Sequence, residues 1–138
     1  MAEDRKKSLV LLVLASTYDK ALATFMTANT ALDMDMDVHI YFSFMGVAIV
    51  KKGFRPKLPG IFRFVTGPYK KRLKKGGVED LEGQIAQAKS KGVKMYVCSM
   101  CINAGLLKKE RIRGGVKPAG YATLLDLIDE SDIYLVIS

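Results

Sequence analysis

Four short segments of the chain are almost continuously apolar, and they alternate with longer segments whose apolar residues recur at helical spacing. The short segments are residues 9–14, 38–45, 93–100 and 133–137. Strands that are apolar on both faces indicate a sheet covered by helices on both sides, and their alternation with helices indicates a parallel sheet. A fifth, marginal edge strand is expected at Val116, ended by Pro118. The pattern predicts an α/β domain of three layers with a mostly parallel sheet of about five strands.

Three amphipathic stripes lie between the predicted strands. The first follows Ser16 or Thr17, either of which can cap a helix, and the second ends before Gly92. The stripes comprise Ala21, Leu22, Phe25, Ala28 and Leu32, then Val78, Leu81, Ile85 and Ala88, then Tyr121, Leu124, Leu125 and Ile128. Apolar residues spaced three to four apart share one face of a helix, so each stripe predicts a helix packed on the sheet.

The segment at about residues 46–77 is too long and too irregular for a simple strand–helix–strand connection. It contains Pro56, Pro59 and Pro68, and it is interpreted as a short helix, an irregular loop and a basic helix. Residues 51–75 hold ten Lys or Arg and no acidic residue, whereas the rest holds twelve basic and fourteen acidic residues. The net charge of +8 therefore comes from this basic insertion. Connections of this kind leave the carboxyl ends of parallel strands, where open α/β sheets bind ligands.

The length of 138 residues predicts a single domain, residues 1–138, with a core that needs no disulfide or metal. The basic start and the apolar run 9–15 resemble a signal peptide, but the run is short and Glu3 and Asp4 interrupt the basic region. No segment has the ~20 apolar residues that span a membrane. A cytoplasmic location is therefore expected, where cysteines are redox-active or inert thiols rather than structural disulfides.

Cys98 is the strongest candidate for chemistry. It lies at the end of the third predicted strand, where the chain turns into a helix. Backbone N–H groups and the positive end of the helix dipole lower the pKa of a thiol in this position. The alternative is a buried cysteine that acts as a small hydrophobic residue in the core.

Cys101 forms a C-x-x-C pair with Cys98, which suggests a dithiol, although Ser99 and Met100 lie between the cysteines instead of the residues usual in thioredoxin-like domains. Two cysteines and the single His39, itself inside a strand, are too few for a zinc site, so no metal is expected. No residue implies a nucleotide, flavin or other cofactor.

Basic residues supply candidate binding groups for anionic donors or acidic partners. They are Lys51, Lys52, Arg55, Lys57 and Arg63 in the basic insertion. Gly120 ends a glycine-containing stretch whose N–H groups could bind a sulfonate or phosphate. The run from Lys70 to Lys75 could bind nucleic acid or a membrane surface, although such a run is more often a solvated helix face.

Several short motifs, taken in order and spacing over almost the whole chain, resemble the DsrE/DsrF-like family, in its longer branch with a basic insertion after the second strand. The motifs are residues 9–15, 41–44 followed by Gly46, 58–60, 92–98, 108–116 and 120–123. The resemblance implies a parallel α/β sheet with helices on both faces and a homo-oligomer, often a trimer or larger. It also implies that the family's sulfur-carrying cysteine corresponds to Cys98, whereas Cys101 departs from the family pattern.

The function expected from the resemblance is sulfur relay. Cys98 would accept sulfane sulfur or a thiosulfonate from a donor protein or a small sulfur anion and pass it to a partner thiol, as a carrier rather than a turnover enzyme. An alternative is a dithiol oxidoreductase in which Cys98 attacks and Cys101 resolves. A third, less favoured alternative is a nucleic-acid or membrane-surface binder acting through residues 70–75, which would not need Cys98; neither a nucleic-acid partner nor a membrane span is expected.

Overall fold

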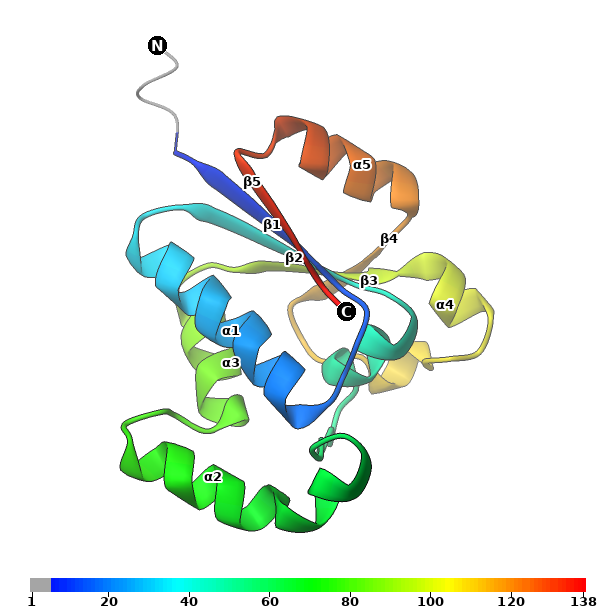
Figure 1. The fold of residues 1–138 in the computed structure, drawn as a ribbon. Coiled ribbons are helices and arrows are strands. Elements are labelled where there is room, and N and C mark those ends of the chain that lie inside the picture. Colours follow the sequence, from blue (N-terminus) through cyan, green and yellow to red (C-terminus); the bar gives the residue numbers. More distant parts are fainter. Residues whose placement is uncertain (1–5) are drawn as a thin grey trace.

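A central parallel sheet with helices on both faces forms the frame of the protein (Figure 1). The computed structural model describes residues 6–138, so Glu3 and Asp4, which interrupt the basic start of the chain, lie outside the described part. The strands are β1 (Ser8–Val13), β2 (Asp37–Phe42), β3 (Lys94–Cys98), β4 (Val116–Ala119) and β5 (Ile133–Ile137). They are ordered β4-β3-β2-β1-β5, and every neighbouring pair is parallel. The predicted fold class is confirmed.

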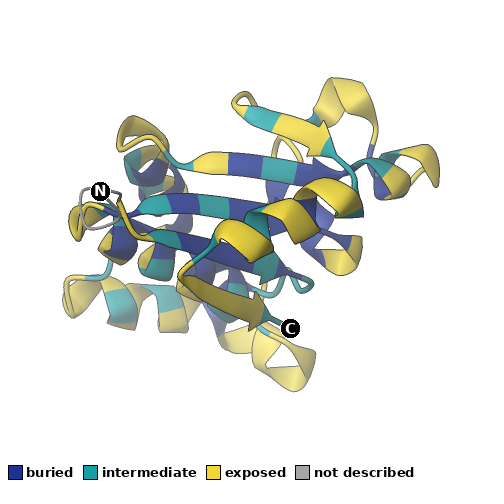
Figure 2. Cartoon of the chain, turned by 90° about the horizontal axis from the view of Figure 1, so that it is seen from above, coloured by how far each residue is buried: buried dark blue, intermediate teal, exposed yellow. Residues whose placement is uncertain are grey.

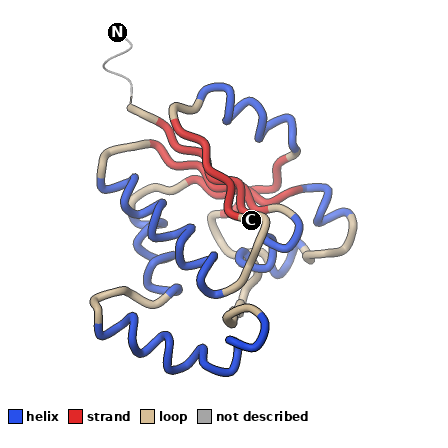
Figure 3. The backbone as a smooth tube through the Cα atoms, in the orientation of Figure 1, coloured by secondary structure: helices blue, strands red, loops and turns tan. Residues whose placement is uncertain are grey.

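The helices cover the sheet unequally. On one face lie α1 (Tyr18–Asp33) and α3 (Leu81–Ser90), and on the other lies α5 (Tyr121–Glu130) (Figures 1 and 3). The predicted stripe of α1 is buried at Ala21, Leu22, Phe25 and Ala28. Thr17 occupies the N-cap position of α1, but its hydroxyl donates to Asp19 Oδ1 at 2.7 Å, so the expected side-chain cap is not formed.

The three inner strands carry the core, and the two edge strands are more exposed (Figure 2). Edge strand β4 includes Pro118 rather than ending before it, because a proline without an N–H is tolerated where one side of the strand has no neighbour. In β5, apolar side chains from Ile133 to Val136 are each at least 40% exposed.

The basic insertion has the predicted outline of short helix, irregular loop and basic helix. Strand β2 ends at Phe42, and the chain continues into the 3₁₀ helices η2 (Phe44–Val50) and η3 (Gly60–Val65) and then α2 (Thr66–Lys75). Helix α2 lies on the α1 and α3 side of the molecule, farther from the sheet than those helices (Figure 1). The basic insertion therefore does not gather wholly at the carboxyl edge of the sheet.

Two short helical segments complete the chain between β3 and β4. They are α4 (Ser99–Asn103), which begins directly after Cys98, and the 3₁₀ helix η4 (Lys109–Arg111). Over residues 6–138, none of the helices combines the length and the apolar character that crossing a membrane requires.

Candidate functional site

The carboxyl ends of three adjacent strands bring the candidate site together. In the register of the sheet, Phe42 on β2 is paired with Val97 on β3, and Cys98 is paired with Ala119 on β4. Ser43, Cys98 and Gly120 therefore leave neighbouring strands at the same edge. This is the edge at which parallel α/β sheets place their ligand sites.

Polar groups from these strand ends surround the two thiols. The backbone N–H of Phe44 donates to the Sγ of Cys101 at 3.3 Å, and the Oγ of Ser43 lies 3.9 Å from the same sulfur. Ser43 Oγ is also 2.5 Å from the hydroxyl oxygen of Tyr121, which follows Gly120 at the start of α5. On β2, the hydroxyl of Tyr41 donates to the carbonyl of Ala119 at 2.9 Å.

The two thiols have opposite pKa shifts. Burial raises the pKa of Cys98, but the backbone N–H and thiol of Cys101 and the nearby hydroxyls of Tyr41 and Ser43 stabilise the thiolate more strongly, so the pKa is lowered. The pKa of Cys101 is raised, first by burial and then by its hydrogen bond to Cys98, against the opposing effect of the Phe44 N–H. Cys98 is therefore the thiol of the pair that ionises first, and Cys101 is its hydrogen-bond donor.

Access to the thiols is restricted. Cys98 is 1% exposed and Cys101 is 3% exposed, and both are free thiols. The neighbouring residues Phe44, Met45 and Met100 are by contrast at least 58% exposed. The sulfur atoms thus lie just beneath a surface of exposed apolar side chains on η2 and α4.

The basic residues singled out in the sequence lie on two separate surfaces. Lys51 lines a cavity of about 370 Å³ beside the segment that follows α4, together with Leu106, Lys108 and Arg111. Lys52 is exposed, and its backbone N–H donates to the carbonyl of Arg111 at 2.7 Å.

The other residues predicted to bind a donor or partner lie away from the Lys51 cavity. Arg55, Lys57 and Arg63 line a different and larger cavity between α2 and the first turns of α1 and α3. Gly120 stands at the N-cap of α5, where an added Cβ atom would lie 3.8 Å from the hydroxyl oxygen of Ser99. In the run from Lys70 to Lys75, the side chains of Lys71, Arg72, Lys74 and Lys75 are exposed along α2.

Three residues at the thiol site were not singled out from the sequence for this role: Tyr41, Ser43 and Tyr121. Tyr41 and Ser43 stand at the end of the second predicted strand, and Tyr121 follows Gly120, which ends the next connection. Polar residues at the carboxyl ends of adjacent parallel strands meet at one edge, and this rule could have found them if the strand order had been known. Among residues 6–138, no cluster of three or more His, Cys, Asp or Glu side chains could hold a metal ion.

The fold and the site together define an α/β protein with a pair of buried thiols at the carboxyl edge of a parallel sheet. The family model described as "DsrE/DsrF-like family" matches residues 7–137, so the chain belongs to the DsrE/DsrF-like family.

Comparisons with individual proteins agree with this assignment. The chain is 26% identical over 159 residues to the sulfur carrier protein DsrE2 of Allochromatium vinosum, covering 96% of this chain and 99% of the relative. It is 29% identical over 161 residues to the uncharacterized protein YrkE of Bacillus subtilis, covering 99% and 100%. The crystal structure of the ychN protein from E. coli has the same fold, with a TM-score of 0.67 at 12% identity, covering 96% of this chain and 99% of that one.

Proposed function

We propose that this protein is a cysteine-based sulfur carrier in which Cys98 accepts sulfane sulfur and passes it to a partner thiol. The observation that carries the proposal is the position of Cys98 at the carboxyl end of β3, directly before α4, where the surrounding groups lower its pKa. The thiolate is the nucleophile in sulfur exchange, and a lowered pKa increases its fraction at neutral pH. The relative named as a sulfur carrier, DsrE2, supports the same role.

Loading is a displacement at sulfur. The Cys98 thiolate attacks the outer sulfur of a persulfide donor R–S–SH, a new S–S bond forms, and the donor leaves as the thiolate R–S⁻. With tetrathionate as donor, the same attack leaves a thiosulfonate on Cys98 and releases thiosulfate. In delivery, an acceptor thiolate attacks the outer sulfur of the Cys98 persulfide and regenerates the Cys98 thiolate, with no net oxidation or reduction.

The burial of Cys98 requires the site to open before loading. The segments that cover the thiols are short: η2 spans seven residues and α4 five. Displacement of either segment would expose the sulfur while the sheet remains intact. A reducing compartment such as the cytoplasm keeps both thiols free for this exchange.

The cavity beside Lys51 is the proposed docking position for an anionic donor or an acidic partner. Lys51, Lys108 and Arg111 line it, and Leu106 and Leu107 in its wall lie shortly after the end of α4 at Asn103. The backbone N–H of Leu106 donates to the carbonyl of Cys101 at 3.0 Å, which joins this wall to the dithiol. Lys52, whose backbone N–H donates to the carbonyl of Arg111, is a further contact of the proposed surface, and Gly120 at the N-cap of α5 is proposed as a separate anion contact.

Intact-protein mass spectrometry after treatment with polysulfide, tetrathionate or thiosulfate tests the carrier function. We expect a reductant-sensitive adduct on the wild type and on Cys101→Ser, and none on Cys98→Ser. Cys101→Ser is the matched control, because it removes an equally buried thiol of the same motif. An adduct that persists in Cys98→Ser, or no adduct on the wild type, would contradict the proposal.

The second candidate function is a dithiol oxidoreductase, favoured by two free thiols three positions apart whose pKa values influence each other. Here Cys101 as thiolate attacks the inner sulfur of a Cys98 persulfide, forming the Cys98–Cys101 disulfide and releasing HS⁻. This function requires both cysteines. The oxidoreductase function would be preferred if Cys101→Ser accepted sulfur but released none as sulfide. It would be rejected if Cys101→Ser delivered sulfur to an acceptor thiol as well as the wild type does.

A further inference from the structure

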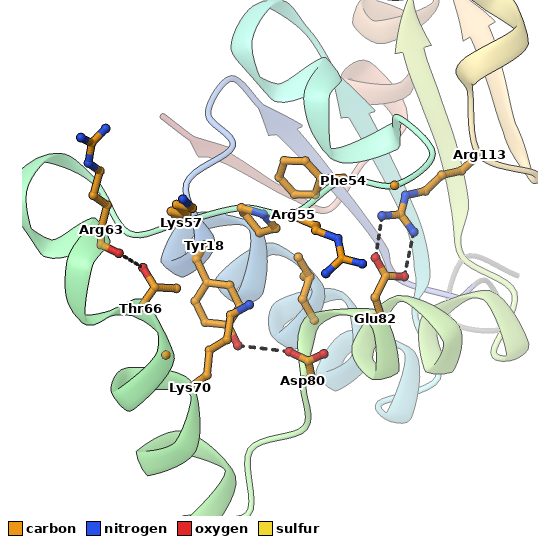
Figure 4. A pocket seen from close by; sticks show the side chains of 14 residues that line it. Tyr18, Phe54, Arg55, Lys57, Arg63, Thr66, Lys70, Asp80, Glu82 and Arg113 are labelled. Atoms are coloured by element: carbon orange, nitrogen blue, oxygen red, sulfur yellow. Dashed lines mark hydrogen bonds and ion pairs between the residues drawn. The ribbon is translucent and has the colours of Figure 1, made fainter.

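A large cavity lies apart from the thiols, between the basic insertion and the helices α1 and α3. Its volume is about 640 Å³. The side chains that surround it come from α1, the segment 53–57, η3, α2, the start of α3 and Arg113 (Figure 4). Neither Cys98 nor Cys101 lines it.

Hydrogen bonds between distant segments hold the walls of this cavity in place. The backbone N–H of Tyr18 donates to the carbonyl of Lys57 at 2.9 Å, which joins the start of α1 to the insertion. The backbone N–H of Leu58 donates to Oγ1 of Thr66 at 3.1 Å, and Nε of Arg113 donates to the carbonyl of Ile49 at 2.9 Å. The cavity is therefore formed by segments that are tied to one another.

Positive charge predominates in the cavity, where five cationic side chains face two carboxylates. Both carboxylates already have partners. Glu82 forms a two-point ion pair with Arg113, with N–O distances of 2.9 and 2.7 Å, and the Tyr18 hydroxyl donates to Asp80 at 3.5 Å. The pair with Arg113 lowers the pKa of Glu82, with partial burial opposing the shift.

Of the remaining four cations that line the cavity, only Arg63 clearly extends away from it (Figure 4). Lys70 Nζ lies 4.6 Å from the centre of the Tyr18 ring. Arg55 and Lys57 border the same space, whereas the guanidinium of Arg63 lies over the Phe64 ring at 4.9 Å and extends away from the other side chains (Figure 4). Within residues 6–138, Arg55, Lys57 and Lys70 form no ion pair with a carboxylate.

Part of the cavity wall is apolar. Tyr18 and Leu81 are 2% and 3% exposed, and the partly buried Phe54 and Pro56 adjoin them. A cavity of this size is in the range that accommodates small organic molecules and exceeds what a single inorganic anion fills. Three unpaired cations beside an apolar wall match a ligand with a multiply charged head and an organic body.

We propose that this cavity binds a small organic anion through its phosphate or sulfonate group. Arg55, Lys57 and Lys70 hold the oxygen atoms of that group, and Tyr18 and Leu81 contact the organic body. This binding site is separate from the thiols, so it does not depend on sulfur transfer by Cys98.

Titration of the ¹⁵N-labelled full-length chain with phenyl phosphate, followed by two-dimensional NMR, tests the proposal. We expect saturable shifts in the amide signals of Gly53, Gly67, Lys70 and Leu81. Removing two of the three cations in the double variant Arg55→Gln/Lys70→Gln should weaken binding by at least about tenfold, since charge-assisted hydrogen bonds are lost. Arg55→Gln alone should also weaken binding. Because the Arg55 side chain is exposed, this variant should fold like the wild type.

The matched control is Lys71→Gln/Lys75→Gln, which removes the same charge from a different surface of α2. It should retain the affinity of the wild type within about twofold, because charges at exposed, distant positions are screened. Equal loss of affinity in the two double variants, or shifts that do not saturate, would overturn the proposal in favour of diffuse attraction to a basic surface.

Parallel titrations identify the group that is bound. Benzenesulfonate and phenyl phosphate contain the organic body, whereas inorganic phosphate and thiosulfate do not. Tighter binding of the aromatic anions supports the proposed ligand class, and equal binding of inorganic phosphate would refute the contact with the apolar wall. Cys98→Ser should bind phenyl phosphate like the wild type, and loss of binding in this variant would contradict the separation of the two sites.

Discussion

The backbone N–H of Phe44 donates a hydrogen bond of 3.3 Å to the Sγ of Cys101, which lies 57 positions later in the chain. Phe44 has a φ of 51°, in the left-handed region that a bulky residue rarely adopts. The same residue begins η2 and exposes 58% of its surface. The contact connects the short helix after β2 to the dithiol. Movement of η2 would therefore break or lengthen a hydrogen bond to the sulfur of Cys101.

The pH dependence of thiol alkylation should reveal the low pKa of Cys98. Below the pKa the thiol is protonated and the rate falls about tenfold per pH unit, so a lowered pKa keeps Cys98 reactive at pH values where ordinary thiols are not. Tyr41→Phe removes a hydroxyl that lowers the pKa of Cys98, so the rate at neutral pH should fall by about three- to tenfold.

Tyr96→Phe is the control for this measurement. Its hydroxyl lies on the same strand as Cys98 but is 3.3 Å from Nδ1 of His39, and it has no part in the thiol site. Alkylation of Cys98, located by mass spectrometry after proteolysis, should be unchanged in this variant. Equal slowing by Tyr41→Phe and Tyr96→Phe would show that the effect is structural rather than electrostatic.

Gly46→Ala should destabilise the fold. A Cβ atom at this position would collide with the carbonyl oxygen of Val13 at the end of β1, and backbone on both sides of the contact would have to move. We expect a loss of roughly 2–4 kcal/mol in the free energy of unfolding, measured by urea denaturation. Gly114→Ala, where no atom lies within 4 Å of the added carbon, should change it by less than about 0.5 kcal/mol, and a similar loss in both variants would refute the explanation.

The packing of α1 on α3 should depend on a buried amide. Nδ2 of Asn29 donates to the backbone carbonyl of Gln84 at 2.9 Å and to its Oε1 at 2.8 Å. Asn29→Ala leaves those acceptors without this donor, and the free energy of unfolding should fall by about 1–3 kcal/mol. Thr30→Ala, at an exposed neighbouring position, should cost less than half as much in the same denaturation experiment, and a reversed order would contradict this role of Asn29.

Self-association is the prediction that follows from the exposed edge strand β5. Ile133, Tyr134, Leu135 and Val136 are 40–46% exposed, and exposed apolar edge strands are prone to pair with another chain. Light scattering should give a mass above that of one chain, and Leu135→Lys should reduce it.

Glu110→Lys, which changes charge in η4 next to the opposite edge of the sheet, is the control for self-association. It should leave the mass of the assembly unchanged. A monomeric wild type, or equal dissociation of the two variants, would contradict an interface built on β5.

The sequence alone determined the parallel sheet. Strands that are apolar on both faces must be covered on both faces, and helices in the connections between parallel strands provide that cover. It also placed Cys98 at the end of a strand and concentrated the positive charge in residues 51–75, since both are properties of local order in the chain.

Only the tertiary structure decided which groups meet Cys98. Periodicity reports whether a strand is covered but not which strand lies beside it, and Tyr41 and Ser43 reach the thiols only because β2 is the neighbour of β3. The basic insertion illustrates the same limit. Lys51 lines a cavity beside the segment that follows α4, and Arg55, four positions later, lines a separate cavity. The reason is that the chain after Lys51 leaves the sheet edge to pack against the start of α1.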